Sequence, residues 1–587
     1  MSDGRSAALI RPNAEIDWWC APAFDSPPLL WSLLDRAGAS ARWLGVRMVQ
    51  HSTSPAGPTA HTTLRGGTGR IECWDGLLGT GPYGVGFVRL VRSEDADLDV
   101  THELALGGFD LPWATWSATA ALVGDTTLQV HGGASRLVNG RWLHTRLRAP
   151  RGAWTALVVA SEGASGARAE DLVASLEAAE EDARRLVADA HLPRHHPERA
   201  ADALAVLDAC TYRATGAVVA SVTTSLPEAV GGDRQFDYRY SWLRDAALAV
   251  SVAALLGRRR AAEAYLGFVR RITTEAGVPS GPLVDVRGKE VPAERDVPGV
   301  AGWGGSIPVR VGNAARGQRQ YDALGMLLES ISVYLQTGGS LDDDTWGMVR
   351  AVADQVAAED ARPSSGIWEF REERPLVSGD IGRWMALDRA IWIARGWRPL
   401  ARRRHWKRAR DQIRQRVLAA LTADGRLPQS YEDPQRSDAA SLMAALFGML
   451  PRSDHRARRL VDVTIEDLEV GPFLYRYEPG SDGFAGQEGA FVPVSWWAVA
   501  ALAATGRVDE ARERADALCA ALPRLMSEEV DPESGAALGN VPLVWSHIEA
   551  ARALYILDAA DLRRRYGRAG LWAWRIGRYL RLRWGWR

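Results

Sequence analysis

The chain has 587 residues, a formal net charge of −1 and a hydrophobic content of 47%. One ordinary core does not extend over so many residues, so we expect a globular protein of two or more domains. The near-neutral charge excludes an overall field that would attract nucleic acid. The four cysteines stand singly, without metal-ligand spacing, and we predict neither a metal site nor a cofactor.

The N-terminal residues 1–13 lack the charged and apolar segments of a signal peptide. The sequence also has no apolar run of the roughly 18 residues that a membrane-spanning helix needs. We therefore expect a cytoplasmic protein.

Residues 1–165 have the pattern of β-structure. Short apolar or alternating runs are interrupted at short intervals by Gly, Pro, Asp and Asn. This pattern is typical of an antiparallel sandwich with many short strands. The predicted strands include residues 7–10, 62–64, 86–91, 98–106, 127–130 and 154–159.

The next stretch, residues 166–197, connects the two expected domains. Its acidic, alanine-rich part at 167–190 predicts a linker helix with a solvated charged face. From residue 198 to 560 the apolar residues recur with a period of about 3.6, as on amphipathic or buried helices. We expect twelve helical segments, at 198–214, 241–256, 258–275, 318–337, 342–360, 380–397, 400–421, 436–450, 455–468, 492–505, 507–523 and 544–560.

These helical segments occur roughly in pairs joined by Gly, Pro or Asp turns, and several longer loops separate them. We expect a closed ring of helices, with a pocket built from the long loops at one end. An open solenoid of paired helices is the alternative. The absence of a strict repeat of roughly 34 to 47 residues argues against the solenoid.

Residues 234–247 alternate aromatic rings with charges. A core segment avoids this mixture, because burying an unpaired charge costs free energy. A sugar site needs it, since rings stack on the apolar faces of a pyranose and fixed charges bind its hydroxyl groups. The apolar residues 246–256 that follow favour a helix, so we place the segment at the mouth of a helix and at the rim of a pocket.

Residues 561–587 form a basic C-terminal tail. From Leu562 onward it contains nine arginines, four tryptophans and no acidic residue. A solvated or poorly ordered tail is the simplest interpretation. A helix that lies on an anionic membrane surface is the alternative, so a peripheral membrane contact stays open. The same charge also suits nucleic acid, which we do not expect as a partner of this chain.

Glycoside hydrolysis requires a carboxylic acid that protonates the leaving oxygen and a second carboxylate that acts as base or nucleophile. Loops beside aromatic residues suit these groups, because partial desolvation raises the pKa of the acid. Each such carboxylate alone is also consistent with a helix cap or a surface acid. The candidates are Glu369 between Trp368 and Phe370, Glu488 in the segment 486–491, and Glu528 with Glu529 in the segment 526–531.

Taken together, these segments resemble the glucoamylase-like enzymes of glycoside hydrolase family 15, in particular their bacterial trehalase-like branch. The resemblance covers nearly the whole chain, and its motifs follow one another in the family's order. The motifs are residues 8–28, 236–246, 304–314, 366–369, 474–477 with 486–491, and 527–531 with 543–547.

The resemblance implies an N-terminal antiparallel β-supersandwich followed by an all-α (α/α)6 barrel. It also implies exo-acting, inverting hydrolysis that releases terminal glucose from trehalose, a malto- or isomalto-oligosaccharide, or another short α-glucan. Glu369 matches the general acid and Glu528 the general base, with Glu529 as the fallback. The residues that match or adjoin sugar-binding positions are Tyr240, Trp242, Arg244, Asp245, Trp368, Arg476, Glu488 and Trp545, and a structural role for Glu488 stays open.

An inverting pair must admit a water molecule, so we expect about 6.5–9.5 Å between the carboxyl groups of Glu369 and Glu528. We expect Trp368 and Phe370 to keep Glu369 partly dry and protonated. Arg244 should keep its neighbour Asp245 ionised, because the cation favours the charged form.

Three departures from the family pattern leave substrate preference open. Phe236 stands where Trp is usual, residues 371–383 lack a run common in the branch, and Phe370 replaces the second acid found next to the general acid in fungal members. An inverting phosphorylase, with an anion site near Arg316, Gly317 and Arg319, is one alternative function. The other is a catalytically inactive glucan-binding or membrane-surface-associated protein. Glu528 argues against the phosphorylase, which needs no base carboxylate, and the two candidate carboxylates together argue against the inactive protein.

Overall fold

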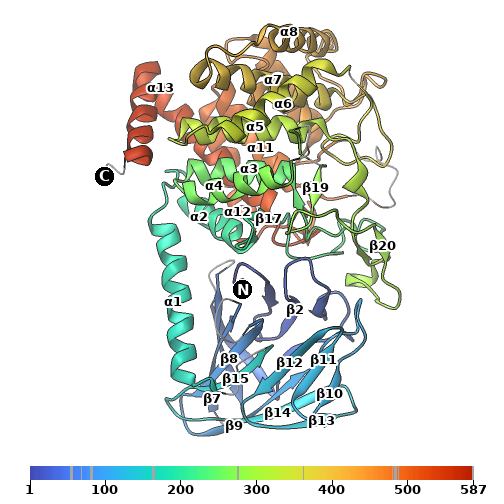
Figure 1. The fold of residues 1–587 in the computed structure, drawn as a ribbon, viewed down its shortest axis with the longest axis vertical. Helices are drawn as coiled ribbons and strands as arrows, with labels where there is room; N and C mark the ends of the chain where they lie inside the picture. The colour runs from blue at the N-terminus through green and yellow to red at the C-terminus, as the bar shows by residue number, and fades with distance from the viewer. Residues whose placement is uncertain are drawn as a thin grey trace.

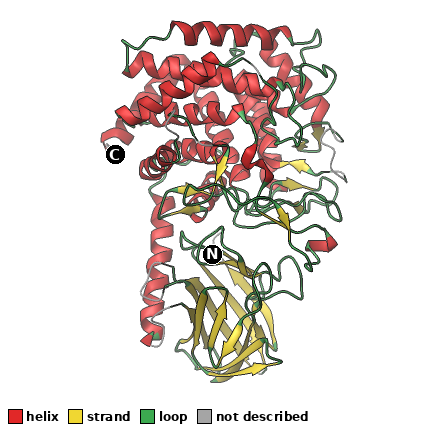
Figure 2. Ribbon diagram, turned by 45° about the vertical axis from the view of Figure 1, so that its right-hand side comes forward, coloured by secondary structure: helices red, strands yellow, loops and turns green. Residues whose placement is uncertain are grey.

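The computed structural model describes residues 1–52, 57–67, 69–79, 84–161, 166–273, 277–279, 281–360, 362–478, 480, 486 and 488–584. It has an N-terminal part built of antiparallel sheets and a C-terminal part built of helices (Figures 1 and 2). Residues 165, 274–275 and 585–587, at the ends of predicted segments, lie outside the described residues.

The N-terminal part contains two antiparallel sheets, with strand orders β1-β2-β4-β9-β14-β13, where β3 pairs with β2, and β10-β11-β12-β15-β8-β7-β6-β5. Apolar side chains of both sheets share one core. Every strand that the sequence predicts overlaps an observed one. The bounds are β1 Ala8–Ile10, β2 Ile16–Cys20, β3 Pro28–Leu30, β4 Ala41–Leu44, β5 Val46–Ser52, β6 Thr59–Gly66, β7 Gly69–Leu77, β8 Gly86–Ser93, β9 Leu98–Leu104, β10 Thr115–Ser117, β11 Ala120–Val123, β12 Thr126–His131, β13 Ala134–Val138, β14 Trp142–Ala149 and β15 Thr155–Ala160.

One ion pair is completely enclosed in this core. Arg89 donates from Nε to Asp75 Oδ1 at 2.7 Å, and both side chains are 0% exposed. The guanidinium also donates to the carbonyl of Ala41 at 3.1 Å. Burying the two charges is tolerated because each is paired and hydrogen-bonded.

The predicted linker helix is α1, Ala169–Ala188. In Figure 1 it runs along one side of the molecule, from the sheets to the helical part. Its buried residues Leu172 and Leu176 share a small cluster with Trp74 and Val88 of the second sheet, and its other end packs on α2. Acidic residues of α1 such as Glu170 and Asp171 are exposed, as the pattern predicts, but Glu180 faces the second sheet and accepts from Trp74 Nε1 at 3.1 Å.

All twelve predicted helical segments contain helix. In succession, α3, α5, α7, α9, α11 and α13 pack against one another, and α13 also packs on α3. The remaining helices α2, α4, α6, α8, α10 and α12 pack against this set. The bounds are α2 Pro197–Ala209, α3 Leu243–Leu255, α4 Arg259–Arg271, α5 Tyr321–Gln336, α6 Asp343–Ala358, α7 Val377–Trp397, α8 Arg404–Ala419, α9 Met443–Leu446, α10 His455–Leu468, α11 Val492–Thr505, α12 Val508–Ala521 and α13 Val544–Trp584.

The composition of the helices explains which of them lie inside. In α11 nearly every side chain is apolar and buried, whereas α8 buries only three residues and exposes its arginines. A helix that is apolar on all sides must be covered on all sides, and an amphipathic helix keeps a face in water. None of the helices in the described part combines the length and apolarity that crossing a membrane requires.

Two helices differ in length from the prediction. The segment predicted at 436–450 is reduced to a 3-10 turn, Ala439–Leu442, and the short α9. Asp438 caps its start by accepting from the backbone of Ala440, and Gly448, with φ at 87°, follows its end. Helix α13 instead continues into the basic tail as far as Trp584, with a break at Gly567.

The two parts of the molecule are joined by direct contacts. Trp18 of β2 donates to the carbonyl of Val222 at 2.8 Å, and Arg239 donates to the carbonyl of Ser26 at 2.6 Å. Apolar residues from loops of the helical part complete the core of the sheets: Leu226, Val297, Val300, Val309 and Val311.

Candidate active site

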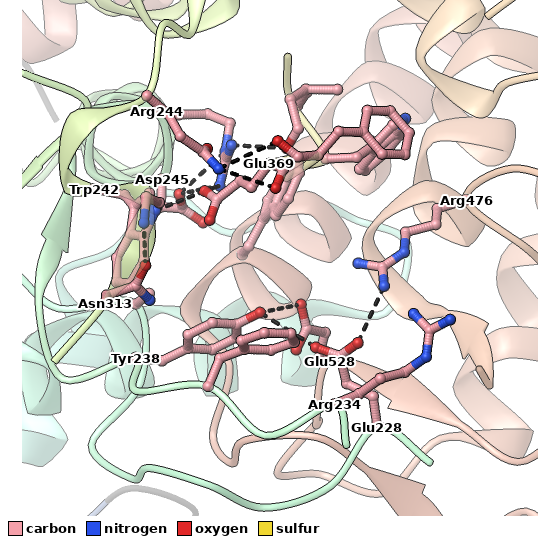
Figure 3. A pocket seen from close by; sticks show the side chains of 18 of the residues that line it. Glu228, Arg234, Tyr238, Trp242, Arg244, Asp245, Asn313, Glu369, Arg476 and Glu528 are labelled. Carbon is pink, nitrogen blue, oxygen red and sulfur yellow. Dashed lines mark hydrogen bonds and ion pairs between the residues drawn. The ribbon is translucent and has the colours of Figure 1, made fainter. Parts of the chain in front are cut away.

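Long loops of the helical part converge on one pocket, as the sequence predicts (Figure 3). Short strand pairs fix these loops. Strand β18, Ser241–Trp242, pairs with β19, Leu283–Val284. Strand β24, Ala490–Phe491, pairs with β25, Glu529–Val530, which pairs with β26, Ala537–Leu538. The other short strands are β16 Thr211–Tyr212, β17 Ala217–Val218, β20 Arg295–Asp296, β21 Arg310–Val311, β22 Glu469–Val470 and β23 Phe473–Leu474.

Glu369 sits in a tight turn with left-handed backbone geometry. Its φ is 60°, and its backbone N–H donates to the carbonyl of Gly366 at 3.2 Å. A residue with a side chain rarely adopts this conformation, and such residues concentrate at functional sites. Gln318 supports the turn by donating to the carbonyl of Glu369 at 3.1 Å.

Two donors hold the side chain of Glu369. Trp242 donates from Nε1 to Oε1 at 2.7 Å, and Arg244 donates from Nη2 to the same oxygen at 3.1 Å. Arg244 also donates to the carbonyl of Ile367 at 2.8 Å, which ties the first turn of α3 to the turn that carries Glu369. The expected neighbour Asp245 accepts from Arg244 Nε at 3.2 Å.

Asp245 shows that burial outweighs the adjacent cation. Arg244 lowers the pKa of Asp245, as expected, but desolvation of the buried carboxyl is the larger effect, and the net shift is upward. Asp322, at the start of α5, lies behind this pair, and burial raises its pKa to about 6. The charge of Arg244 is therefore surrounded by Asp245, Asp322 and Glu369.

Glu528 is the second candidate carboxylate, and it precedes β25. Tyr238 donates from its hydroxyl to Glu528 Oε1 at 3.0 Å. Successive residues of an extended strand point to opposite sides, which explains why Glu528 lines the pocket while Glu529 does not. Glu529 instead accepts from the backbone of Gly489 at 2.8 Å. The sequence leaves a choice between the two neighbours, and only Glu528 faces the pocket.

A second carboxyl, Glu228, adjoins Glu528. Tyr238 lies within 3.4 Å of Glu228 Oε1, so the one hydroxyl bridges both acids. Burial raises the pKa of Glu528 well above its ordinary value, and the charge of Glu228 raises it further. Oε2 of Glu528 is buried and has no donor among the described residues. A proton shared by the two carboxyl groups relieves their repulsion.

Buried arginines neutralise the acids behind the pocket. Arg476 donates to Glu488 at 2.7 Å and to Glu228 at 3.1 Å, and Arg234 donates to Glu488 at 3.1 Å. Oxygen atoms of Glu228, Glu488 and Glu529 lie within 4.8 Å of one another, a spacing that also suits a metal ion. The two guanidinium groups supply the positive charge here, so we assign the cluster as an ion-paired network.

Aromatic rings form one wall of the pocket. Trp368 stacks on Trp545 with centroids 6.1 Å apart, and Arg244 lies 4.7 Å from the centroid of Trp545. The indole of Trp368 donates to Asp438 at 2.8 Å. On another side the rings of Phe236 and Tyr238 are stacked. Apolar rings with a few fixed polar groups are the usual lining of a small-molecule site.

Most of the predicted residues meet at this pocket. Those that line it are Trp242, Arg244, Asp245, Trp368, Glu369, Arg476, Glu528 and Trp545. Two predicted residues are not among the lining residues. Tyr240 packs in a cluster with Leu283 and Val291, and Glu488 lies behind Arg476.

The sequence interpretation missed Glu228, Tyr238, Asn313 and Gln318 as lining residues. Tyr238 belongs to the segment of alternating rings and charges, and that pattern could have identified it as a pocket residue. Glu228 stands alone after a proline, and no local pattern identifies it. The arginines of the anion site that a phosphorylase would need have other partners: Arg316 pairs with Glu290 at 3.0 Å and Arg319 with Glu373 at 3.0 Å.

Figure 3 shows the carboxyl groups in two sets, Glu369 with Arg244 and Trp242 above, and Glu528 with Tyr238 and Glu228 below. Carboxyl groups on different sides of an aromatic, partly desolvated pocket are typical of the glycosidases. The comparison with known families agrees. The model of glycosyl hydrolases family 15 matches residues 200–523. The chain belongs to this family and is a glycoside hydrolase.

Individual relatives match most of the chain. The trehalase of Mycolicibacterium smegmatis is 29% identical over 609 residues, which cover 96% of this chain and 91% of that protein. The trehalase of Thermoplasma acidophilum is 32% identical over 375 residues, which cover 62% of this chain and 63% of that protein. The crystal structure of a bacterial glucoamylase complexed with acarbose has a TM-score of 0.67 at 12% identity, covering 95% of this chain and 93% of that one. At this identity the likeness shows the fold alone.

Proposed function

We propose that this protein is an inverting, exo-acting α-glucosidase whose first substrate is trehalose. The placement of Glu369 and Glu528 in one pocket carries the proposal. The name trehalase of the relatives that match along nearly the whole chain supports the substrate. Malto- and isomalto-oligosaccharides and other short α-glucans are the further substrates of the same chemistry.

In this proposal Glu369 is the general acid. Trp242 and Arg244 both donate to its Oε1, so Oε2 carries the proton. Glu369 gives that proton to the glycosidic oxygen as the bond from this oxygen to the anomeric carbon breaks. The left-handed turn and its supports at Gly366 and Gln318 hold the carboxyl in place before substrate binds.

Glu528 is the general base. It accepts a proton from a water molecule, whose oxygen attacks the anomeric carbon on the face opposite to the leaving group. Inversion therefore requires the separation of about 6.5–9.5 Å between the two carboxyl groups. Glu528 must give up the proton that it shares with Glu228 before this step, and Tyr238, which donates to Glu528, orients the base.

The terminal glucose is bound by the charged and aromatic residues around Glu369. Arg244 and Asp245 are held in the first turn of α3 and bind hydroxyl groups, and Arg476 presents a second cation to the pocket. Trp545 and Trp368 line the pocket and form an apolar wall for the sugar.

We further propose that the chain divides into a β-supersandwich at 1–165, a helical linker at 166–197, an (α/α)6 barrel at 198–560 and a tail at 561–587. The contact of α13 with α3, which closes the succession of inner helices, supports the barrel. Six such helices with six others around them give the alternation that the name describes.

The anomeric form of the product tests the mechanism. Inverting hydrolysis of trehalose releases one β-glucose from the attacked ring and one α-glucose from the leaving group. Proton NMR within the first minutes of reaction, before mutarotation, should therefore show equal amounts of both anomers. Two α anomers would overturn inversion. A panel with maltose, isomaltose, kojibiose, nigerose and dextrin ranks the substrates, and no glucose from any of them would overturn the function.

A further inference from the structure

The tail forms a helix of its own after the break at Gly567, where φ is 66° and ψ is −167°. In Figure 1 this helix stands at the edge of the helical part, next to the C-terminus. The catalytic proposal uses none of its residues, and none of them lines the pocket. Its composition therefore calls for a separate explanation.

One side of this helix attaches it to the body. The ring of Trp574 lies 5.5 Å from that of Tyr555, and the buried guanidinium of Arg578 lies 4.5 Å from the centroid of Tyr555. Leu582 approaches Gly257 after α3, and Arg583 donates to the carbonyl of Gly338 at 3.0 Å. Trp574, Arg578 and Leu582 stand four residues apart and mark the side of the helix that faces the body, whereas Arg583 lies on the other side and attaches only the last turn.

The outward side is an apolar stripe. Trp572, Ile576, Tyr579 and Leu580 follow the i, i+4, i+7, i+8 spacing that places residues on one face of a helix. Trp572 is 68% exposed and Tyr579 is 38% exposed, and the other two are half-buried. An amphipathic helix normally buries such a stripe, whereas here Trp572 and Tyr579 stay exposed.

Arginines border this stripe. Arg568 and Arg575 stand four and three residues from Trp572, and Arg575 stands four residues from Tyr579, so they are its neighbours on the helix. Arg568, Arg575 and Arg581 form no ion pair within the part of the chain that the structure describes. From Leu562 onward the tail has nine arginines and no acid while the whole chain has a net charge of −1, so the positive charge is local to the tail.

We propose that this face of the tail helix, around Trp572 and Tyr579, binds the surface of an anionic lipid membrane. An interfacial helix inserts Trp, Tyr, Ile and Leu at the boundary of head groups and acyl chains, while its arginines contact the lipid phosphates. The arginines are complementary in charge to phosphates, and the apolar stripe requires a partner with an apolar layer. Nucleic acid has phosphates but no apolar layer.

Vesicle sedimentation of the full-length protein tests the proposal. The probes are vesicles of phosphatidylcholine alone and vesicles with equal parts of phosphatidylglycerol. We expect sedimentation only with the anionic vesicles, and a loss of that binding as salt is raised. Trp572→Glu should weaken it about tenfold or more, and Arg568→Gln with Arg575→Gln should also weaken it about tenfold or more. The matched controls are Leu400→Glu, at a side chain that is 97% exposed, and Arg402→Gln with Arg408→Gln, both exposed.

Several outcomes would overturn the proposal. One is wild-type protein that stays in the supernatant with anionic vesicles, and another is equal binding by Trp572→Glu and the wild type. A dimer in solution that Trp572→Glu converts to a monomer, without vesicle binding, would assign the stripe to a second copy of the chain. Glucose release should be unchanged in both tail variants, because the tail is outside the pocket.

Discussion

The indole nitrogen of Trp242 donates a hydrogen bond of 2.7 Å to Oε1 of Glu369. Trp242 ends strand β18 at the mouth of α3, and Glu369 occupies a turn 127 residues later. This bond joins the segment of mixed rings and charges to the proposed general acid. The segment therefore orients the acid in addition to lining the sugar pocket.

Replacing Glu369 by Gln removes the proposed proton donor and keeps the shape of the side chain. We expect kcat on trehalose to fall by about 10²–10⁴-fold. Binding of the substrate, measured by calorimetry, should persist. Glu373→Gln is the matched control, because Glu373 is an exposed acid of the same loop, paired with Arg319. Turnover close to wild type in Glu369→Gln would refute the assignment.

Trp242→Phe tests the orienting hydrogen bond alone. The ring remains, but Glu369 loses one of its two donors. A hydrogen bond between neutral groups contributes roughly 0.5–1.5 kcal/mol, so we expect kcat to fall about two- to tenfold. Trp303→Phe, at a tryptophan that is 40% exposed, serves as the control. If kcat is unchanged in Trp242→Phe, this bond does not position the acid.

Glu528→Gln removes the proposed base. We expect turnover to fall by about 10²–10⁴-fold because the attacking water is no longer deprotonated. Glu533→Gln changes an exposed acid of the same loop and should leave turnover as it is. Steady-state kinetics on trehalose compares the turnover of the two variants. Equal loss in both would contradict the specific role of Glu528.

The pH profile should shift in opposite directions in two variants. The base must be ionised to act, so its pKa sets the acidic limb of kcat/KM. Glu228 raises the pKa of Glu528, and the hydrogen bond from Tyr238 lowers it. Glu228→Gln should therefore move the acidic limb to lower pH, and Tyr238→Phe should move it to higher pH. Shifts in the same direction would show that Glu228 and Tyr238 do not tune this base.

The ion pair inside the sheets allows a test of stability. Asp75→Ala leaves the buried charge of Arg89 unpaired, so we expect a loss of about 3–5 kcal/mol in the free energy of unfolding. Asp99→Ala breaks an exposed pair with Arg146 in the same part of the chain and should cost about 1 kcal/mol or less. Denaturant unfolding measures both, and similar losses would mean that Arg89 finds another partner.

The sequence predicts this fold well because its two periodicities differ clearly. Alternating runs mark the strands, and the 3.6-residue period marks the helices. The prediction is weakest where tertiary contacts determine whether a segment forms a helix. The tail alone indicates a solvated segment as readily as a helix, and the contacts of Trp574 with Tyr555 give it a docking surface on the body.

The candidate site is predictable where its residues belong to motifs. Glu369 and Glu528 have distinctive neighbours in sequence, and both line the pocket. Glu228 has none, because its importance comes from contacts with residues hundreds of positions away. Tyr240 shows the opposite error, since it stands in the motif but packs behind the pocket. Local pattern does not state which side of an irregular loop faces the ligand.

The hydrogen bond from Arg239 to Ser26 couples the evolution of the sheets to that of the helical part. Arg239 pairs with Asp237 at 2.7 Å in the middle of the pocket segment, so a loop of the sheets supports the segment that holds the sugar. The sheets and the helices are thus expected to change together. A chimera that exchanges the sheets with those of a distant relative would disturb the pocket, although none of the described residues of the sheets lines it.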